Sequence, residues 1–468
     1  MVLLVVAGSI YAYAQFRFGQ INKVTVGGLS TTQANKPINI LLIGSNTRKG
    51  LKPSQAKYFG SSSQVGGARS DVTMIAHFDP ATHQVSLVSI PRDLFMPIPN
   101  SVSANRVDAA LNVSPKRLVA TIQQDLGIPI QHVMELNFNS FQEVVQALGG
   151  VKMYFKMPVK DAYSGLNITS PGCKNLNGFQ ALEVVRSRHL YYKQYGYWHA
   201  DPTGDLGRIR RDHEFLKVLA KQVQSKVSTN PIALNSIISS VVKYVKVDSG
   251  FTFNDMISLA TQYQNVSLST VKTVTLPVAL ENGPNNQGYI YKGVNYGDIV
   301  FPAEPQDTKI IDAYLGLSVP NISPRSITTS VLNGTGGYQQ ASSIAHSLKK
   351  LGFHIATIGN ATVTSGYYSQ SVNPTETIIR YEPGYLSKAE VVKNALSGAV
   401  IMGQINHTIT GSPIEIVAGT GLSVASVPSS YSQSSSSNSS KVPQAKPTLP
   451  ATPSNQNLSP WDPRSCKS

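Results

Sequence analysis

The sequence predicts an α/β protein with two folded domains and a disordered C-terminal tail. Short β-branched runs and helical patterns intermix from residue 37 to about 316, and again from 327 to about 420. A length of 468 residues fits two or three folded units, and 41% hydrophobic residues suffice for a buried core. We therefore expect a large domain over 37–316 and a smaller one over 327–420.

The elements of the larger domain follow from the spacing of its apolar residues. Residues 37–43 form a short apolar run that stops at Gly44, which predicts a buried strand. Leu118, Ile122 and Leu126 recur every four residues and predict a helix over 115–126. Further strands are expected over 72–78 and 85–90, and further helices over 141–148 and 206–227.

A linker with two prolines is expected over 317–326. The smaller domain is then predicted to contain strands over 327–332, 354–358 and 376–381, and helices over 339–351 and 388–396. Residues 423–468 are rich in serine and proline, which predicts a disordered tail. Cys173 and Cys466 lie too far apart, and are too few, to indicate a disulfide framework or a zinc site.

An apolar run over residues 1–20 is about the minimum length for a membrane span, which takes roughly 17–25 residues. Its position before a polar stretch favours a transmembrane signal anchor, truncated at its start, over a buried core helix. Arg17 and Lys23 follow the uncharged residues 1–14, so the positive-inside rule alone would place the body in the cytoplasm. The orientation of the anchor therefore depends on other evidence.

The formal net charge of +15 indicates an anionic partner. Nucleic acid, an anionic membrane surface and phosphate groups on a substrate all fit this charge, and composition does not distinguish them. The sequence contains no Walker-type glycine loop, no Gly-x-Ser-x-Gly elbow and no His-Glu-x-x-His motif.

Two arginine–aspartate groups occur at the ends of predicted strands. Arg69 and Asp71 precede the strand over 72–78, and Arg92 and Asp93 follow the strand over 85–90. Strand ends are where α/β folds collect ligand-binding groups. Arginine suits phosphate, and aspartate can hold a Mg²⁺ that bridges phosphate oxygens. The alternative for each pair is a salt bridge that ties a loop to the sheet.

A third group is Arg186 and Arg188, which lie two residues apart. In an extended backbone both guanidinium groups would face one site, and two such groups without a paired acid are hard to explain structurally. The alternative is a solvated basic surface. We favour a binding role for this pair.

The fourth group lies in the first turns of the helix predicted over 206–227. At helical spacing Arg208 and Arg211 share one edge, where cations oppose the helix dipole unless an anion is bound nearby. The alternative is pairing with Asp205 and Asp212. This placement of cations is the strongest indication of a phosphate site.

In their order along the chain these motifs resemble the LytR-CpsA-Psr family. They are NILLIGSNTR at 39–48, ARSD at 68–71, SIPRD at 89–93, LGGV at 148–151, LNGFQAL at 176–182, RSR at 186–188 and DLGRIRR at 205–211. Residues 327–419, with VLNGT at 331–335 and IRYEPG at 379–384, resemble the C-terminal domain found in many members. The resemblance implies an α-β-α sandwich with a central mixed sheet, followed by a small α/β domain.

The resemblance also implies a membrane-anchored, Mg²⁺-assisted phosphotransferase on the outer, wall side of the plasma membrane. Such enzymes take a glycopolymer from a polyprenyl-pyrophosphate carrier and join it to peptidoglycan through a phosphodiester. The residues that match the pyrophosphate-binding arginines are Arg48, Arg69, Arg92, Arg106, Arg186, Arg188 and Arg208.

The resemblance assigns the metal to Asp71, with Asn46 beside it. The catalytic candidates are Arg92, Asp93, Arg186, Arg188 and Asp205, with Asp93 or Asp205 orienting or deprotonating the acceptor hydroxyl. Two positions depart from the family pattern. Asn46 replaces the usual aspartate, which should weaken Mg²⁺ binding, and Asp212 replaces the usual glutamine.

Three alternatives accompany this hypothesis. The same site could hydrolyse the lipid pyrophosphate, or the protein could be a non-catalytic scaffold that binds wall polymer. A nucleic-acid binder is disfavoured, because the arginines cluster near aspartates without interleaved aromatic residues. The apolar stretches 122–130 and 133–145 could line a tunnel for the polyprenyl chain, although an ordinary core explains the same pattern.

Overall fold

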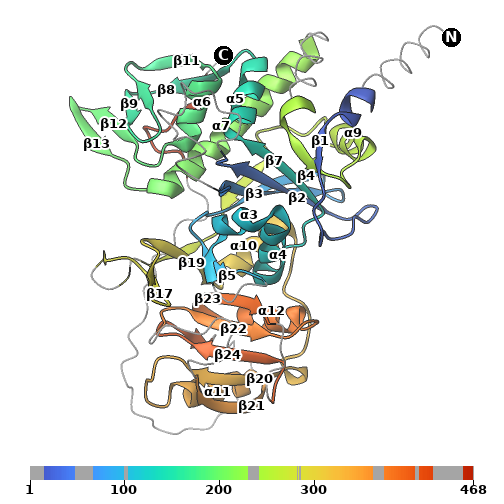
Figure 1. The fold of residues 1–468 in the computed structure, drawn as a ribbon, viewed down its shortest axis with the longest axis vertical. Helices are drawn as coiled ribbons and strands as arrows, with labels where there is room; N and C mark the ends of the chain where they lie inside the picture. The colour runs from blue at the N-terminus through green and yellow to red at the C-terminus, as the bar shows by residue number, and fades with distance from the viewer. Residues whose placement is uncertain are drawn as a thin grey trace, which may run out of the picture. The chain divides into compact units, whose positions relative to one another are not determined.

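The computed structural model describes residues 15–47, 67–99, 104–229, 242–281, 283, 286–361, 374–405, 411–424 and 457–466. The chain divides into two compact units (Figure 1). Unit 1 comprises residues 1–92, 130–275 and 455–468, and unit 2 comprises residues 93–129 and 276–454.

Unit 1 is built on a mixed sheet that the described strands form. In order across the sheet they are β1 (Asn22–Val24), β14 (Lys246–Asp248), β7 (His132–Asn137), β2 (Ile38–Ser45), β3 (Ser70–Asp79), β4 (Gln84–Ile90) and β15 (Lys272–Thr275). β2 pairs antiparallel with β3 and parallel with β7, and β3 pairs antiparallel with β4. Buried side chains on both faces of β2 and β3 explain their apolar runs. The predicted central mixed sheet is confirmed.

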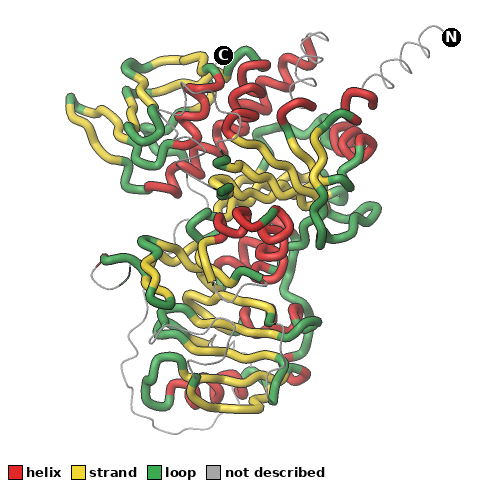
Figure 2. The backbone as a smooth tube through the Cα atoms, in the orientation of Figure 1, coloured by secondary structure: helices red, strands yellow, loops and turns green. Residues whose placement is uncertain are grey.

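The described part of unit 1 includes four helices of nine residues or more. They are α5 (Phe138–Ala147), α6 (Gly178–Arg186), α7 (Gly204–Thr229) and α9 (Phe253–Gln262) (Figure 2). The Asn137 side chain caps α5 by accepting from the Ser140 amide, and Asn177 with Gln180 forms a capping box at α6. These caps place the N-termini of α5 and α6 at fixed residues.

Two smaller sheets complete unit 1. One runs β10 (Leu166–Ile168), β9 (Val159–Asp161), β12 (Tyr191–Gln194) and β13 (Tyr197–Ala200). The other runs β11 (Gly172–Leu176), β8 (Val151–Phe155) and β26 (Arg464–Ser465). Their inner faces share one apolar core with α6 and α7, which includes Val151, Phe155, Val184 and Phe215.

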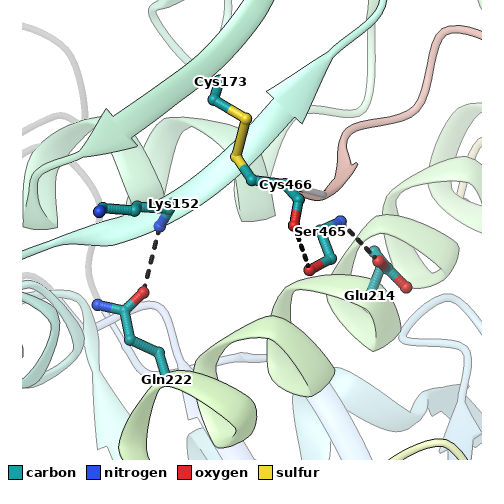
Figure 3. The surroundings of a disulfide bond; sticks show 6 residues. All are labelled: Lys152, Cys173, Glu214, Gln222, Ser465 and Cys466. Atoms are coloured by element: carbon teal, nitrogen blue, oxygen red, sulfur yellow. Dashed lines mark hydrogen bonds between the residues drawn. A yellow bond between two sulfur atoms is a disulfide. The ribbon is translucent and has the colours of Figure 1, made fainter. Parts of the chain in front are cut away.

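The C-terminal end of the chain is ordered, so the predicted tail is wrong over residues 457–466. Strand β26 pairs antiparallel with β8, and Cys466 forms a disulfide with Cys173 of β11 (Figure 3). The Ser465 amide donates to the Glu214 carboxylate of α7 at 3.0 Å. This disulfide could not be predicted from the sequence, because a pairing across 293 residues leaves no local signal. Residues 425–456 of the predicted tail lie outside the described residues.

Unit 2 contains a second mixed sheet. Its described strands, in order, are β16 (Val278–Glu281), β19 (Ile299–Glu304), β23 (Leu396–Gln404), β22 (Thr377–Tyr381), β24 (Ile414–Ala418), β20 (Thr328–Asn333) and β21 (His354–Asn360), with β25 (Ser423–Val424) paired to β23. The helices are α3 (Ala110–Val113), α4 (Pro115–Leu126), α10 (Gln306–Leu315), α11 (Gln340–Lys350) and α12 (Leu386–Asn394). Short strands β5 (Phe95–Pro97) and β6 (Ala104–Arg106) also belong to this unit.

The predicted linker over 317–326 does not separate the two units. Ala303 of β19 pairs with Ala399 of β23, so strands from both sides of the linker share one sheet. A buried ion pair between Lys393 and Glu304, at 3.0 Å, also crosses this boundary. Two prolines indicate a loop, but they do not reveal which strands pair across it. Unit 2 therefore includes part of the predicted large domain together with the whole predicted small one.

Most of the predicted anchor over 1–20 lies outside the described residues. Within the part of the chain that the structure describes, none of the helices combines the length and apolar content needed to cross a bilayer.

Candidate functional site

A cavity of about 420 Å³ lies within unit 1, at one edge of its central sheet. The carboxyl ends of β2, β4 and β7 meet at this edge, since β2 runs parallel to β7 and both β2 and β4 run antiparallel to β3. The amino end of β3 lies at the same edge and contributes Asp71. Ligand sites in α/β folds commonly occur beyond the carboxyl ends of strands.

The lining of this cavity combines a polar group and an apolar group of side chains. The polar and charged residues include Ser45, Asn46, Asp71, Arg92, Asn137, Arg186, Arg188, Arg208 and Asp212. The apolar residues include Leu42, Met74, Met134, Leu136, Phe138, Phe141, Leu182, Val185, Phe215 and Leu216. The cavity thus suits a ligand with one anionic end and one apolar end.

Arg208, in the second turn of α7, is the most buried of the cavity arginines, with 3% of its surface exposed. Its guanidinium donates to Asp205 at 2.8 and 3.1 Å and to Asp212 at 3.2 Å. Although burial alone would lower it, these aspartates raise the pKa of Arg208 above its ordinary value. The arginine is therefore a fixed, fully charged donor at the cavity wall.

Asp205 connects Arg208 with Arg188. The Arg188 Nε lies 2.7 Å from Asp205 Oδ1, the oxygen that also accepts from Arg208. Burial opposes ionisation, but Arg208, Arg188 and Arg92 hold the pKa of Asp205 well below its ordinary value. Asp205 therefore stays ionised and holds the arginines in position.

Arg92 and Arg186 complete the arginine group, from two other elements. Arg92 follows β4 and pairs with Asp71 of β3. Arg186 ends α6, and its guanidinium lies over the Phe138 ring, 4.6 Å from the centroid. Among the described residues, the four arginines of the cavity contact three aspartates, Asp71, Asp205 and Asp212, so the group has one more arginine than aspartates.

Asp212 differs from the other carboxylates in this group. One of its oxygens accepts from Arg208, while Oδ1 is buried without a hydrogen-bond partner in the described structure. Burial raises the pKa of Asp212 to about 7, despite the opposing effect of Arg208. A cavity carboxyl with this pKa can take up or release a proton near neutral pH.

A buried carboxylate that sequence reasoning missed shapes the loop carrying Arg188. Asp161 Oδ2 accepts from the Ser187 hydroxyl at 2.8 Å and from the amides of Arg188 and His189, both at 2.9 Å. Burial alone would raise the pKa of Asp161, but these hydrogen bonds and those from neighbouring amides hold it below its ordinary value. No local motif links Asp161 to a loop 26 residues away.

Arg211 faces away from the cavity, contrary to its predicted edge shared with Arg208. Its Nη1 donates to Asp201 at 2.7 Å and to Asp462 at 3.1 Å, and Nη2 donates to the Ser187 carbonyl at 2.7 Å. Arg210 also donates to Asp462, at 2.6 Å. The two arginines thus attach α7 to the C-terminal segment.

The predicted metal pair does not have the geometry of a magnesium site. Asn46 directs its amide nitrogen at Asp71 Oδ1, 3.4 Å away, and its amide oxygen accepts from the Arg69 backbone amide at 3.0 Å. Asp71 is already paired with Arg92. No group of three or more histidine, cysteine, aspartate or glutamate side chains suited to a metal occurs among the described residues.

The other predicted site residues fall in several places. Arg92, Arg186, Arg188 and Arg208 line one cavity together with Asp71 and Asn46, and Asp205 pairs with two of these arginines. The expectation that no acid accompanies Arg186 and Arg188 is wrong, since Asp205 pairs with Arg188. Arg69 is exposed and is not among the lining residues. Arg48 lies outside the described residues.

Two further candidates belong to unit 2. Arg106 pairs with Asp93, with 3.2 Å between Nε and Oδ1, and it also donates to backbone carbonyls of Tyr296 and Asp298. Neither residue is among those that line the cavity. Of the apolar stretches, 133–145 supplies cavity residues such as Met134 and Phe141, whereas Ile122 and Leu126 are buried in unit 2.

Sequence comparisons identify relatives of both parts of the chain. The pattern of the LytR_cpsA_psr family matches residues 12–300, and that of the LytR cell envelope-related transcriptional attenuator matches residues 326–421. The probable cell wall biosynthesis protein LcpB of Corynebacterium glutamicum is 30% identical over 233 residues, covering 49% of this chain and 53% of that protein. The cell wall biosynthesis protein LcpA of the same organism is 28% identical over 309 residues, 64% of this chain and 55% of that protein.

A third relative is the polyisoprenyl-teichoic acid–peptidoglycan teichoic acid transferase TagU of Enterococcus faecalis. It is 28% identical over 263 residues, which are 56% of this chain and 74% of that protein. Among solved structures, a LytR-Csp2A-Psr enzyme from Actinomyces oris aligns with a TM-score of 0.49 at 22% identity, over 63% of this chain and 95% of that one. The chain spans just over half the length of LcpB and LcpA. Because the match over residues 12–300 includes more than half of its length, this protein belongs to the LytR-CpsA-Psr family.

Proposed function

We propose that this protein transfers a glycopolymer from a polyprenyl-pyrophosphate carrier to peptidoglycan, forming a phosphodiester. The observation that carries the proposal is the lining of the unit 1 cavity, where four arginines adjoin a group of apolar side chains. A lipid pyrophosphate has the same division, with two phosphates at one end and a hydrocarbon chain at the other. The similarity to a teichoic acid transferase supports the same chemistry.

In the proposed reaction an acceptor hydroxyl oxygen attacks the phosphorus that carries the glycan. The new P–O bond forms as the bond to the bridging oxygen breaks, and polyprenyl phosphate leaves with the electron pair. Negative charge builds on the leaving phosphate, and the fixed guanidinium groups of Arg92, Arg188 and Arg208 stabilise it. Asp71 and Asp205 already hold the guanidinium groups of these arginines in position, so the groups need little reorganisation during the reaction.

The hydroxyl proton needs an acceptor, and Asp212 is better placed for this role than the two predicted candidates. Asp93 lies in unit 2 and pairs with Arg106, while Asp205 is bound to two arginines that depress its pKa. Asp212 lines the cavity, has one oxygen without a partner among the described residues, and has a pKa of about 7. We assign it as the general base.

The proposal places the protein at the plasma membrane, anchored through its N-terminal segment, with both units on the wall side. The disulfide between Cys173 and Cys466 supports this location, since disulfides persist in oxidising compartments. Magnesium assistance remains a prediction of the family resemblance and has no assigned step.

Reconstituted transfer tests the proposal. With a lipid-linked glycan and peptidoglycan as substrates, wild-type protein should yield glycan bound to peptidoglycan and free polyprenyl phosphate. Arg92→Ala should reduce the rate by about 10²–10³-fold, because one electrostatic donor is lost. Arg325→Ala, which removes an exposed arginine of unit 2, serves as the control and should leave the rate unchanged.

Product analysis separates the alternatives. Glycan phosphate released at the same rate with and without peptidoglycan would indicate a pyrophosphatase. Well-folded protein that binds glycan without any turnover would indicate a scaffold.

A further inference from the structure

One face of the small sheet β10-β9-β12-β13 is uncovered and carries an unusual set of side chains. Side chains alternate between the two faces of a sheet. The pairing of Lys160 with Asn167 and Tyr191, and of Lys193 with Trp198, therefore places these five residues on one face, which we call the outer face. All five are exposed, and Tyr191 and Trp198 keep 43% and 38% of their surface accessible.

The opposite, inner face explains why the sheet is stable. Val159, Leu166 and Ile168 are buried in the core that β8, α6 and α7 share. Tyr192 stacks on Trp461 of the C-terminal segment, with ring centroids 4.1 Å apart and an interplanar angle of 2°. The inner face thus holds the sheet in place, and packing does not account for aromatic residues on the outer face.

The charge of the outer face indicates which kind of ligand this face can bind. At their outer-face positions the described strands carry two lysines and no carboxylate, since Asp161 of β9 pairs with Leu166 and lies on the inner face. The Lys160 ammonium lies over the Trp198 ring, 4.2 Å from its centroid, so a cation and an aromatic ring are already in contact on this face. A sugar ring can pack its C–H face on Trp198 or Tyr191, while an acidic substituent meets a lysine.

The hairpin that joins β12 and β13 adds a strained aromatic residue. Tyr195 has φ of 51° and Gly196 has φ of 85°, the signs of a type I′ turn, in which asparagine or glycine is normally found first. The Tyr195 side chain is 87% exposed, so burial does not offset this backbone strain. Strained residues that gain nothing from packing are characteristic of binding surfaces.

We propose that the outer face, with Tyr195 at its edge, binds an acidic saccharide chain. The choice of a saccharide rests on the proposed function, in which both donor and acceptor are glycans. β12 begins three residues after Arg188, and β13 ends eight residues before Arg208, so the sheet is continuous in the chain with the arginine group on both sides.

A lipid surface is a poorer fit to the same face. Alanine is the sole aliphatic residue on the outer face of the described strands, whereas interfacial segments usually add leucine or phenylalanine. Within unit 1, the β12–β13 hairpin also lies on the opposite side from β1, which follows the proposed anchor (Figure 1). The membrane and nucleic acid are outcomes that the test distinguishes.

Binding measurements with the full chain test the proposal. The probe is an oligogalacturonate, which is acidic, contains no phosphate and has no lipid. Dextran, a single-stranded DNA oligonucleotide and phosphatidylglycerol–phosphatidylcholine vesicles are the competing ligands. We expect oligogalacturonate to bind, and Trp198→Ala and Lys160→Gln each to weaken binding roughly tenfold.

The matched control is Tyr197→Ala, on the same hairpin. Tyr197 is 74% exposed but lies on the other face of the sheet, since it pairs with Gln194. Its loss should change the affinity by less than about twofold. Thermal unfolding verifies that each variant is folded, and Tyr191→Ala replaces Trp198→Ala if the latter does not fold.

The proposal is overturned if wild-type protein does not bind oligogalacturonate, or if Trp198→Ala and Tyr197→Ala behave alike. Equal binding of dextran would overturn the role of the lysines. Stronger, Trp198-dependent binding to vesicles or DNA would assign the face to those partners instead. Transfer assays stay separate: if wild-type protein transfers no glycan to peptidoglycan while Trp198-dependent binding of oligogalacturonate persists, the proposed function fails and the saccharide surface stands.

Discussion

The two sides of helix α7 use the same residue type for opposite purposes. On the cavity side, Arg208 joins Arg92, Arg186 and Arg188, and the arginines outnumber the aspartates that contact them. On the other side, Arg210 and Arg211 meet two aspartates, Asp201 and Asp462. The excess of charge on the first side suits a ligand, whereas the balanced charges on the second stabilise the fold. The carboxylates around an arginine, more than its position on a helix, indicate its role.

The largest difference between the two sides of α7 is expected for substitutions that keep the positive charge of the arginine. Arg208→Lys keeps the charge but loses the planar fork, so we expect transfer to fall about 10²-fold. Arg211→Lys loses buried hydrogen bonds to two carboxylates and a carbonyl, and the free energy of unfolding should fall by about 2–3 kcal/mol. Transfer kinetics and urea unfolding of both variants check this. If the two variants had equal effects on transfer and on unfolding, the two sides of α7 would not differ in role.

Asp212 provides the next largest effect, on the pH dependence of transfer. As the general base with a pKa of about 7, it should make the rate rise as the pH increases through 7. Asp212→Asn should lower the rate about 10²-fold and remove that rise. A pH–rate profile that keeps its shape in Asp212→Asn would show that another group accepts the proton.

The same group links stability to pH. Burial raises the pKa of Asp212 from 3.8 to about 7, so the folded state holds a proton that the unfolded chain releases. Its stabilising contribution is complete below about pH 4 and is lost as the pH rises towards 7. Urea unfolding of wild type and Asp212→Asn should therefore diverge over this interval, with the wild type losing stability relative to the variant.

The side of α7 that contacts the C-terminal segment is tested by removing the disulfide at the end of the chain. Cys466→Ser should lower the free energy of unfolding by about 2–4 kcal/mol, the usual range for a native disulfide. Reductant should have the same effect on wild type and none on the variant. Unchanged stability in Cys466→Ser would show that Asp462 and strand β26 hold the segment without the disulfide.

The smallest effect is expected at the metal position. Asn46→Asp places a second carboxylate beside Asp71, where the amide nitrogen now donates at 3.4 Å. Magnesium should then raise the melting temperature of the variant more than that of wild type, because paired carboxylates favour the ion. If wild type shows the larger shift, Asn46 and Asp71 already bind magnesium. Thermal unfolding with magnesium and with a chelator distinguishes these outcomes.

Local patterns predicted much of the fold. The helix expected over 115–126 matches α4 residue for residue, because Ser114 caps it and Gly127 ends it. Strand β23 was missed, since it begins at Leu396, where the predicted helix over 388–396 still continued. The pairing of β19 with β23 joins segments about 100 residues apart, and no local pattern encodes it.

The candidate site also contains residues that local patterns predict and residues that they do not. Three of the cavity arginines could be predicted from their positions. Arg92 follows a strand, Arg188 follows a helix and Arg208 lies near the start of one, and each lies near other arginines. Asp462 could not, since its contacts with Arg210 and Arg211 span more than 250 residues. Asp161 acts through backbone amides of a distant loop, which no side-chain motif records.

The sheet of unit 2 bears on how this protein can be divided in the laboratory or in evolution. The matched family segments end at residue 300 and resume at 326, which suggests two exchangeable modules. A chain ending at 316 would nevertheless leave one edge of β19 open where β23 now pairs, and Glu304 would lose Lys393. Open sheet edges recruit strands from other molecules. The LytR C-terminal segment is therefore expected to be inherited and expressed together with the rest, and its removal should produce aggregates.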